Sequence, residues 1–324
     1  MPPLRSTQRS RFARLVGLAT LLALFPLQPA WALHADGSAT VELLIDDGRP
    51  MVMLRVEGPG GAMAHGRFLV DTGGGAFILP EATAREAGIV WGEPMTAEGR
   101  ELARPETAVT ARMSDLQLPL RPERTLVAIG REIGLLPGHV LAQFHVVFDY
   151  PARTLTFAPP GSVEPIGRSM PMPVSQPMGF PRTEIELGDE RLGMLLDTGP
   201  AATILSDAVV ARLHDAHPQW PYHDDAREEA EALERAGGQV LATLVARNAR
   251  WAGLDIGPVT LASQQEGVFE NWMSGMMTAP IVGALGSNVF LDFRLELDYA
   301  NETLYLSRRD CRDGSSPSND GRCR

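Results

Sequence analysis

The most constraining feature of this 324-residue chain is that it repeats itself. An Asp-Thr-Gly triplet occurs twice, at residues 71–73 and 197–199, each time at the end of an apolar strand-like run. An apolar stretch follows each triplet, and then a helix-favouring segment, Glu81 to Ala87 in the first half and Asp207 to Leu213 in the second. A strand and a turn also precede each triplet, so the shared pattern extends well beyond three residues.

A second pair of blocks recurs farther along in the same order. Residues 140–150 end the first half and residues 289–299 end the second, and both run through a turn into a Thr-Leu pair. Two blocks in the same order indicate a tandem duplication. The 32 glycines and 26 prolines are spread along the chain, which suits many short strands joined by turns. We therefore predict an all-β fold of two lobes related by a pseudo-twofold axis, with a few short helices.

The predicted organisation has five parts: a signal peptide at 1–32, an N-terminal lobe at 33–157, a linker at 158–181, a C-terminal lobe at 182–307 and a polar tail at 308–324. Seven prolines in the linker predict an extended connection without an element of its own. The second half has 23 more residues between its blocks than the first. We expect much of this excess in His214 to Gly238, as a short exposed acidic helix.

The first residues are typical of an export signal. Four arginines precede an apolar stretch, Leu15 to Leu27, and Ala30-Trp31-Ala32 offers small residues for cleavage. The stretch is short for a membrane span, although an uncleaved anchor is the alternative. We expect a periplasmic or secreted protein without a membrane span after cleavage. The net charge of −11 then becomes about −15, which gives no electrostatic reason to bind nucleic acid.

The two cysteines, Cys311 and Cys323, both lie in the polar tail. Two interpretations stay open: a tail disulfide formed in an oxidising compartment, or free thiols in a disordered tail. All 29 basic residues are arginines, so the chain has no lysine for Schiff-base or lysine-nucleophile chemistry.

The duplicated triplet predicts a pair of carboxylates, because pseudo-twofold symmetry brings two equivalent turns face to face. Two carboxyl groups that share one proton can act together. One takes a proton from a water molecule, while the other donates a hydrogen bond to the scissile carbonyl. Each glycine lets the backbone pass close behind a carboxylate, and each threonine can hydrogen-bond toward the opposite lobe. The residues predicted for this site are Asp71, Thr72, Gly73, Asp197, Thr198 and Gly199.

These motifs resemble the pepsin and retropepsin clan of aspartic proteases, and more closely the bacterial retropepsin-like proteins that carry both lobes in one chain. The resemblance covers roughly residues 40–306. It implies that Asp71 and Asp197 are catalytic and that the neighbouring threonines and glycines support them. The implied activity is an endopeptidase that uses activated water, without metal or organic cofactor. The implied partner is a peptide or an unfolded protein, and the implied state is a monomer.

The sequence departs from the family pattern behind the first catalytic turn. The family places an apolar-apolar-Gly element there, which is Ala284-Leu285-Gly286 in the second half. The same register in the first half gives Leu135-Leu136-Pro137, with Gly138 one position late. The residue after the triplet is usually serine, threonine or alanine in the family.

In this chain that residue is Gly74 in the first half and Pro200 in the second. The family also closes its cleft with a β-hairpin flap. The matching ranges by spacing are Met95 to Thr107 and Glu231 to Leu244, where Gly237-Gly238 makes a flexible tip. Two flaps fit the symmetry better than one.

Three other interpretations compete. A metal site could use His214, His217 and His223 with the adjacent Asp224 and Asp225, but the spacing suits no helix face and a solvated acidic insertion fits better. A serine nucleophile at Ser206 or Ser287 has no organised histidine partner. A protein of the same fold that binds peptides with weak or no turnover is the main rival, although paired acids that repel one another have no use in a binder.

Overall fold

The computed structural model describes residues 36–97, 99–224, 240–265 and 267–308. Three β-sheets make up most of the molecule, which confirms the all-β, two-lobed prediction. The signal segment, the tail with Cys311 and Cys323, Asp225 and most of the second expected flap range lie outside the described residues. Within the described residues, no helix is both long and apolar enough to cross a membrane.

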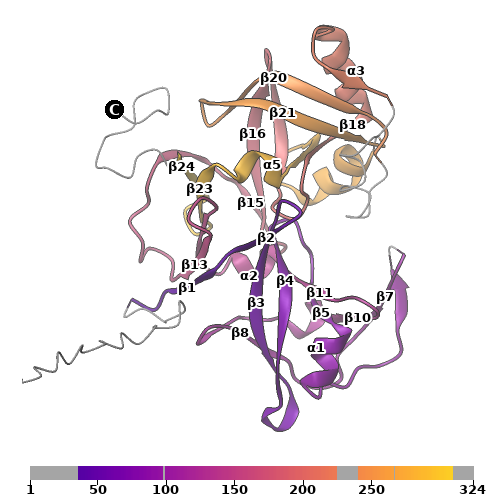
Figure 1. The fold of residues 1–324 in the computed structure, drawn as a ribbon, viewed down its shortest axis with the longest axis vertical. Helices are drawn as coiled ribbons and strands as arrows, with labels where there is room; N and C mark the ends of the chain where they lie inside the picture. The colour runs from indigo at the N-terminus through magenta and orange to yellow at the C-terminus, as the bar shows by residue number, and fades with distance from the viewer. Residues whose placement is uncertain (1–35, 98, 225–239, 266, 309–324) are drawn as a thin grey trace, which may run out of the picture.

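The N-lobe, at the bottom of Figure 1, is built on a ten-stranded sheet. Its strands alternate buried and exposed residues, as in β4, where Ala64, Gly66 and Phe68 point inward and their neighbours outward. The strands are β2 (Leu44–Asp46), β3 (Arg49–Glu57), β4 (Met63–Asp71), β5 (Phe77–Pro80), β6 (Met95–Ala97), β7 (Arg100–Ala103), β8 (Thr110–Met113), β9 (Leu116–Gln117), β10 (Thr125–Ala128) and β11 (Ile133–Pro137).

The C-lobe, at the top of Figure 1, is built on an eight-stranded sheet. Its strands are β15 (Val174–Ser175), β16 (Phe180–Leu187), β17 (Glu190–Leu196), β18 (Thr203–Ser206), β19 (Tyr222–His223), β20 (Thr243–Trp251), β21 (Leu254–Gln264) and β22 (Gly283–Leu285). Short helices complete the two lobes: η1 (Pro59–Gly61), α1 (Glu81–Glu86), η2 (Pro122–Arg124), α2 (Gly138–Leu141), α3 (Asp207–Ala216), η3 (Val268–Met273), η4 (Ser274–Met276) and α5 (Ser287–Phe290).

The two lobes share one pattern of strand pairing around the triplets. The strand that ends in the triplet runs parallel to a later strand, with Val70 opposite Leu136 in the N-lobe and Leu196 opposite Leu285 in the C-lobe. In both lobes that later strand also pairs with the strand after the triplet. The tandem duplication predicts that the two lobes share this strand topology.

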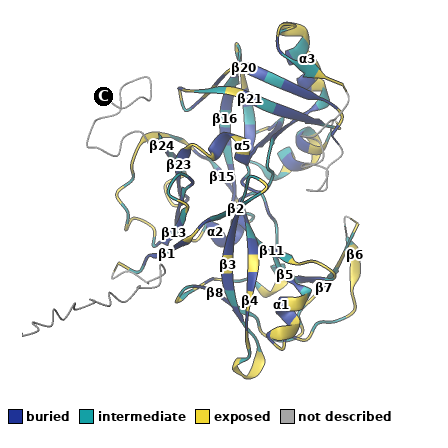
Figure 2. Cartoon of the chain, viewed as in Figure 1, coloured by how far each residue is buried: buried dark blue, intermediate teal, exposed yellow. Residues whose placement is uncertain are grey.

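A third, six-stranded sheet joins the lobes, and we call it the interlobe sheet. Its two central strands come from the second pair of repeated blocks, with His145 of one opposite Asp298 of the other. Figure 2 shows long buried stretches where the three sheets converge, and exposed residues at the outer turns. In spatial order the strands are β1 (Ala39–Glu42), β13 (Thr154–Ala158), β12 (His145–Asp149), β23 (Phe293–Asp298), β24 (Thr303–Arg308) and β14 (Arg168–Pro171).

The structure corrects two expectations about loops. Residues 158–181 are extended but not free of elements, because β14 joins the interlobe sheet and β15 pairs with β16. The excess of the second half also lies mainly elsewhere than expected. Ala128 to Pro137 spans nine positions, whereas the equivalent Gln264 to Gly286 spans 22, so this stretch holds 13 of the 23 extra residues. We call residues 265–282 the β21–β22 segment, which forms η3 and η4.

The first expected flap range contains a hairpin, formed by β6 and β7. In Figure 1 it projects from the N-lobe on the side away from β1 and β13. In the C-lobe, β19 pairs with the start of β20, so His223 and Thr243 lie opposite each other in the sheet.

Candidate active site

Both triplets sit in matching turns at the ends of strands. Asp71 ends β4, and Asp197 directly follows β17. The N–H of Gly73 donates to Asp71 Oδ1 at 3.0 Å, and the N–H of Gly199 donates to Asp197 Oδ1 at the same distance. Each half-buried carboxylate is therefore oriented by its own turn and stays in reach of solvent.

The two turns face each other so closely that no side chain fits between them. A Cβ atom on Gly73 would lie 2.5 Å from Asp197 Oδ2, and one on Gly199 would lie 2.8 Å from Asp71 Oδ1. Contacts below 3.0 Å are incompatible with ordinary packing, so a side chain at either position would displace the carboxylate of the opposite lobe. Each glycine therefore passes close to the carboxylate of the opposite lobe. The sequence analysis did not specify which of the two carboxylates each glycine would approach.

The two threonines link the lobes through four reciprocal hydrogen bonds. Thr72 Oγ1 donates to the carbonyl of Leu196 at 2.6 Å and accepts from the N–H of Thr198 at 3.0 Å. Thr198 Oγ1 donates to the carbonyl of Val70 at 2.6 Å and accepts from the N–H of Thr72 at 3.2 Å. Both threonines are completely buried. Because each hydroxyl is used as donor and acceptor, the relative position of the two turns is tightly fixed.

The packing behind Asp71 is intact despite the departure at Pro137. Pro137 lies opposite Asp71 in the parallel pairing and takes the place of Gly286. The N–H of Gly286 donates to Thr203 Oγ1 at 3.2 Å. In the N-lobe the position equivalent to Thr203 is Phe77, whose side chain cannot accept a hydrogen bond. Pro137 has no N–H and therefore needs no acceptor there. The two changes compensate, since donor and acceptor are both missing.

Burial raises the pKa of both aspartates, and for Asp71 the negative charge of Asp197 adds to the effect. The N–H groups of Gly73 and Gly74 oppose this at Asp71, because they stabilise its ionised form. At Asp197 the opposing donors include the N–H of Gly199, while Pro200 has no N–H to offer. The side-chain hydrogen bond between the two carboxyl groups raises the pKa of Asp71 and lowers that of Asp197, so the two groups are coupled in their titration.

Ser287, considered above as a nucleophile, and two residues that the sequence did not single out, Arg124 and His139, lie near the Asp-Thr-Gly turns. Ser287 Oγ donates to the carbonyl of Thr198 at 3.0 Å, so this serine supports the turn and is no nucleophile. Arg124 donates to the carbonyl of Gly75. The N–H of Gly138 donates to the carbonyl of Gly74, and the buried His139 follows Gly138 directly. The Arg124 contact spans 49 positions, and no local pattern predicts such a contact.

The histidines considered for a metal site are packed against aromatic rings. His214 stacks on Tyr222 with ring centroids 4.3 Å apart, and His217 stacks on Trp220 at 4.1 Å. Across the described ranges, no group of three or more His, Cys, Asp or Glu side chains is arranged to hold a metal ion. Ser206, the other serine considered, is buried with no partner for its hydroxyl in the described part of the chain.

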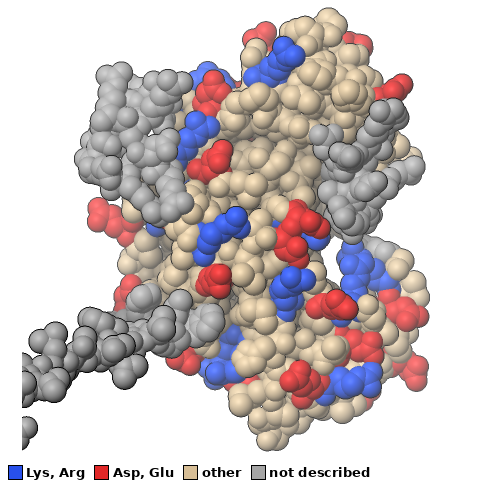
Figure 3. Space-filling view, in the orientation of Figure 1, with Lys and Arg blue, Asp and Glu red and all other residues tan. Residues whose placement is uncertain are grey.

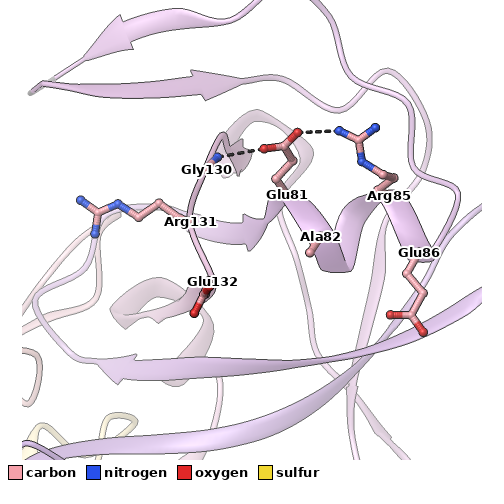
Figure 4. A pocket seen from close by; sticks show the side chains of 7 residues that line it. All are labelled: Glu81, Ala82, Arg85, Glu86, Gly130, Arg131 and Glu132. Atoms are coloured by element: carbon pink, nitrogen blue, oxygen red, sulfur yellow. Dashed lines mark hydrogen bonds and ion pairs between the residues drawn. The ribbon is translucent and has the colours of Figure 1, made fainter.

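A surface hollow on the outer side of α1 lies apart from the dyad (Figure 4). The Glu81 carboxylate at its centre already accepts hydrogen bonds from the N–H of Gly130 at 2.9 Å and from Arg85 at 2.6 Å. None of its lining residues belongs to either Asp-Thr-Gly turn. They are Glu81, Ala82, Arg85, Glu86, Gly130, Arg131 and Glu132.

Comparison with known proteins finds a likeness of fold among solved structures. No family model and no curated protein matches the chain. Among solved structures, the aspartic proteinase from Irpex lacteus matches 84% of this chain and 97% of its own, at 14% sequence identity and a TM-score of 0.49. At this distance the functional argument rests on the geometry of the site.

Proposed function

We propose that this protein is an aspartic endopeptidase with Asp71 and Asp197 as its catalytic dyad. The observation that carries the proposal is the fit of the two turns, in which each glycine leaves room for the carboxylate of the opposite lobe and the threonines connect the lobes. Such a fit brings two acids into contact at a cost in repulsion. A pair of acids that shares one proton is suited to activating water.

In the proposed reaction, the ionised carboxylate takes a proton from a water molecule as the water oxygen attacks the scissile carbonyl. The protonated carboxyl group donates a hydrogen bond to the carbonyl oxygen and stabilises the developing negative charge. A C–O bond forms, the C–N bond then breaks, and the leaving amine receives a proton from the dyad. Thr72 and Thr198 keep the carboxylates in position, and no cofactor takes part.

The finer features of the proposal rest on the sequence. We place the protein with the single-chain retropepsin-like proteases, because both triplets occur in one duplicated chain. The substrate is an unfolded protein or peptide, and export by the segment 1–32 places the reaction in the periplasm or outside the cell. The protein acts as a monomer, since both halves of the dyad belong to one chain.

The test is cleavage of an unfolded protein by the chain that begins after residue 32. Wild type should generate peptides, and a statine-type inhibitor, which mimics the attacked carbonyl, should block it. Chelators and thiol or serine reagents should have no effect. Loss of activity with a chelator that zinc restores would contradict the proposal.

One observation favours the rival function of a peptide-binding protein, namely that Pro200 deprives Asp197 of a hydrogen-bond donor. Binding of peptides without any cleavage, by wild-type protein shown to be folded, would support that rival.

A further inference from the structure

Arg124 places a guanidinium group beside the first catalytic turn. It is the last residue of η2 and directly precedes β10. Its Nη1 donates to the carbonyl of Gly75 at 3.3 Å and lies 2.8 Å from the sulfur of Met178. Gly75 follows Asp71 by four positions, so the guanidinium lies next to the loop that carries Asp71.

The contact with Met178 places Arg124 at the boundary between the lobes. Met178 belongs to the turn between β15 and β16, and its terminal methyl group would lie 3.0 Å from a Cβ on Gly75. On its other side Met178 packs, half-buried, against an apolar cluster of the C-lobe. That cluster also borders Ala202, five positions after Asp197. Arg124 is therefore connected, directly and through Met178, to the residues that follow both triplets.

Arg124 has no acidic partner in the described part of the chain. Arg85 pairs with Glu81 and Arg112 with Glu57, whereas both contacts of Arg124 are to uncharged atoms. A guanidinium group has five N–H donors, and these contacts use a minority of them. The half-buried Arg124 therefore has hydrogen-bonding capacity left for an anion.

The surroundings of Arg124 are positive, although the whole chain has a net charge of −11. Burial, and then the charges of Arg121 and Arg124, lower the pKa of His139 to about 4, and Glu123 acts against them. Neither ring nitrogen of His139 has a hydrogen-bond partner within the described residues. Figure 3 shows basic side chains on the N-lobe near the β6–β7 hairpin, with acidic side chains among them. A positive region in an acidic protein favours a negatively charged ligand.

We infer that Arg124 is a specificity-determining residue that binds a carboxylate group of the substrate beside the dyad. The inference rests on the proposed function and adds the substrate class, namely peptides with an acidic group at one fixed distance from the scissile bond. Arginine suits this role because its planar group can bind a carboxylate through two parallel hydrogen bonds. The carboxylate belongs either to an Asp or Glu side chain or to the C-terminus of the peptide.

The experiment compares matched peptides that differ in one group. One series replaces Gln by Glu at each position around the cleaved bond, and a second replaces a C-terminal amide by the free acid. For wild type, kcat/KM should favour the acidic member at one position by roughly tenfold to a hundredfold, as for a hydrogen bond to a charged group. The series that shows the preference identifies the source of the carboxylate. Equal rates throughout both series would overturn the inference.

Three variants test the residue itself. Arg124→Gln should abolish the preference while cleavage of the neutral peptides continues, and Arg124→Lys should retain part of it because the charge remains. Arg85→Gln is the matched control, since it removes one positive charge from the N-lobe on the exposed side of α1. A preference that survives in Arg124→Gln, or that Arg85→Gln loses to the same degree, contradicts the assignment. Thermal melting shows whether each variant is folded. If Arg124→Gln does not fold, the preference measured for Arg124→Lys decides whether Arg124 binds the carboxylate.

A binding measurement separates this inference from the proposed function. Calorimetry with the Asp71→Asn variant measures Kd for the same peptide pairs at pH 7 without turnover. If wild type cleaves nothing but the acidic peptides bind more tightly in an Arg124-dependent manner, the inference holds and the proposed function fails. If wild type cleaves peptides but neither rate nor Kd depends on the acidic group, the proposed function holds and the inference fails.

Discussion

The two Asp-Thr-Gly turns are alike in the groups that they present to each other and different in the residues that support them within their own lobes. Both contribute a carboxylate, a glycine and a threonine with the same hydrogen bonds across the interface. Asp71 has Pro137 on the neighbouring strand and a hydrogen bond from the N–H of Gly74. Asp197 has Gly286 after the neighbouring strand, and Pro200 offers it no N–H. The face that meets the other lobe has therefore kept its symmetry, while the supporting side has diverged.

This difference indicates where the chemistry imposes a constraint. A side chain at Gly73 or Gly199 would strike a carboxylate in the opposite lobe, so neither turn can change alone. Behind the turns, a change has consequences within one lobe, and a second change nearby can offset it. Pro137 with Phe77, in place of Gly286 with Thr203, is such a pair.

The largest expected effect tests whether the two carboxylates are equivalent in function. Asp71→Asn and Asp197→Asn should each reduce kcat/KM by at least roughly 10²- to 10⁴-fold, because an amide can neither accept the proton of water nor share one. Activity on an unfolded protein, with circular dichroism to show that each variant is folded, checks this. Substantial turnover in either variant would show that its aspartate lies outside the dyad.

The next effect tests the symmetry of the threonine contacts. Thr72→Val and Thr198→Val each leave a buried carbonyl and a buried N–H unpaired, so each should lower the free energy of unfolding by about 2–4 kcal/mol. Denaturant unfolding measures both losses.

We expect the two losses to agree within about 1 kcal/mol, because the bonds are reciprocal. Thr40→Val is the control, since its hydroxyl contacts Thr156 in a partly exposed pair. A large loss in one variant and none in the other would show that one lobe holds the interface alone.

A smaller effect, on the pH dependence of activity, tests the difference between Gly74 and Pro200, the residues that follow the two triplets. Pro200→Ala supplies an N–H where Gly74 already has one, and a donor near Asp197 favours its ionised form. The pKa of the dyad should fall, and the acid limb of kcat/KM against pH should move to lower pH by up to about one unit. A limb that stays in place, or moves upward, would contradict this role for the missing donor.

The matching change in the N-lobe is Gly74→Ser, which would add a hydroxyl donor near Asp71. A Cβ at this position would lie 2.5 Å from Leu135 Cδ2, so that side chain must rotate away first. We expect the same downward shift of the acid limb, more clearly in Gly74→Ser combined with Leu135→Ala. For wild type we predict an optimum at mildly acidic to neutral pH.

The smallest effect concerns stability. Folding raises the pKa of the dyad, so its contribution to stability is largest in acid and is lost as the pH rises through the raised pKa. An asparagine at this position would not ionise, so Asp71→Asn removes this loss of stability and should raise Tm at pH 7 by about 2 °C. Below the ordinary aspartate pKa of about 3.9 the gain should disappear. Equal melting temperatures at pH 7 would show that the dyad carries no strain.

Much of this structure could be predicted because the duplication is visible in the sequence. Two triplets in the same context placed Asp71 and Asp197 in equivalent turns. The second pair of blocks indicated the duplication, and in the structure it forms the central strands of the interlobe sheet. The sequence did not reveal the contact of Arg124 with Gly75, because it depends on a strand crossing that brings distant positions together. It also misplaced the extra residues of the second half. Acidic composition drew attention to residues 214–238, while most of the excess forms the turns of the β21–β22 segment.

The interlobe sheet determines how the dyad behaves on dilution. Its central strands, β12 and β23, come from different halves of one chain, and every residue of β12 is paired, from His145 opposite Asp298 to Asp149 opposite Arg294. In a protein assembled from two separate lobes, the dyad would exist only in the associated fraction, and activity per molecule would fall as the solution is diluted. Here the two aspartates meet at an effective concentration set by covalent connection. Specific activity should therefore be the same at nanomolar and at micromolar protein.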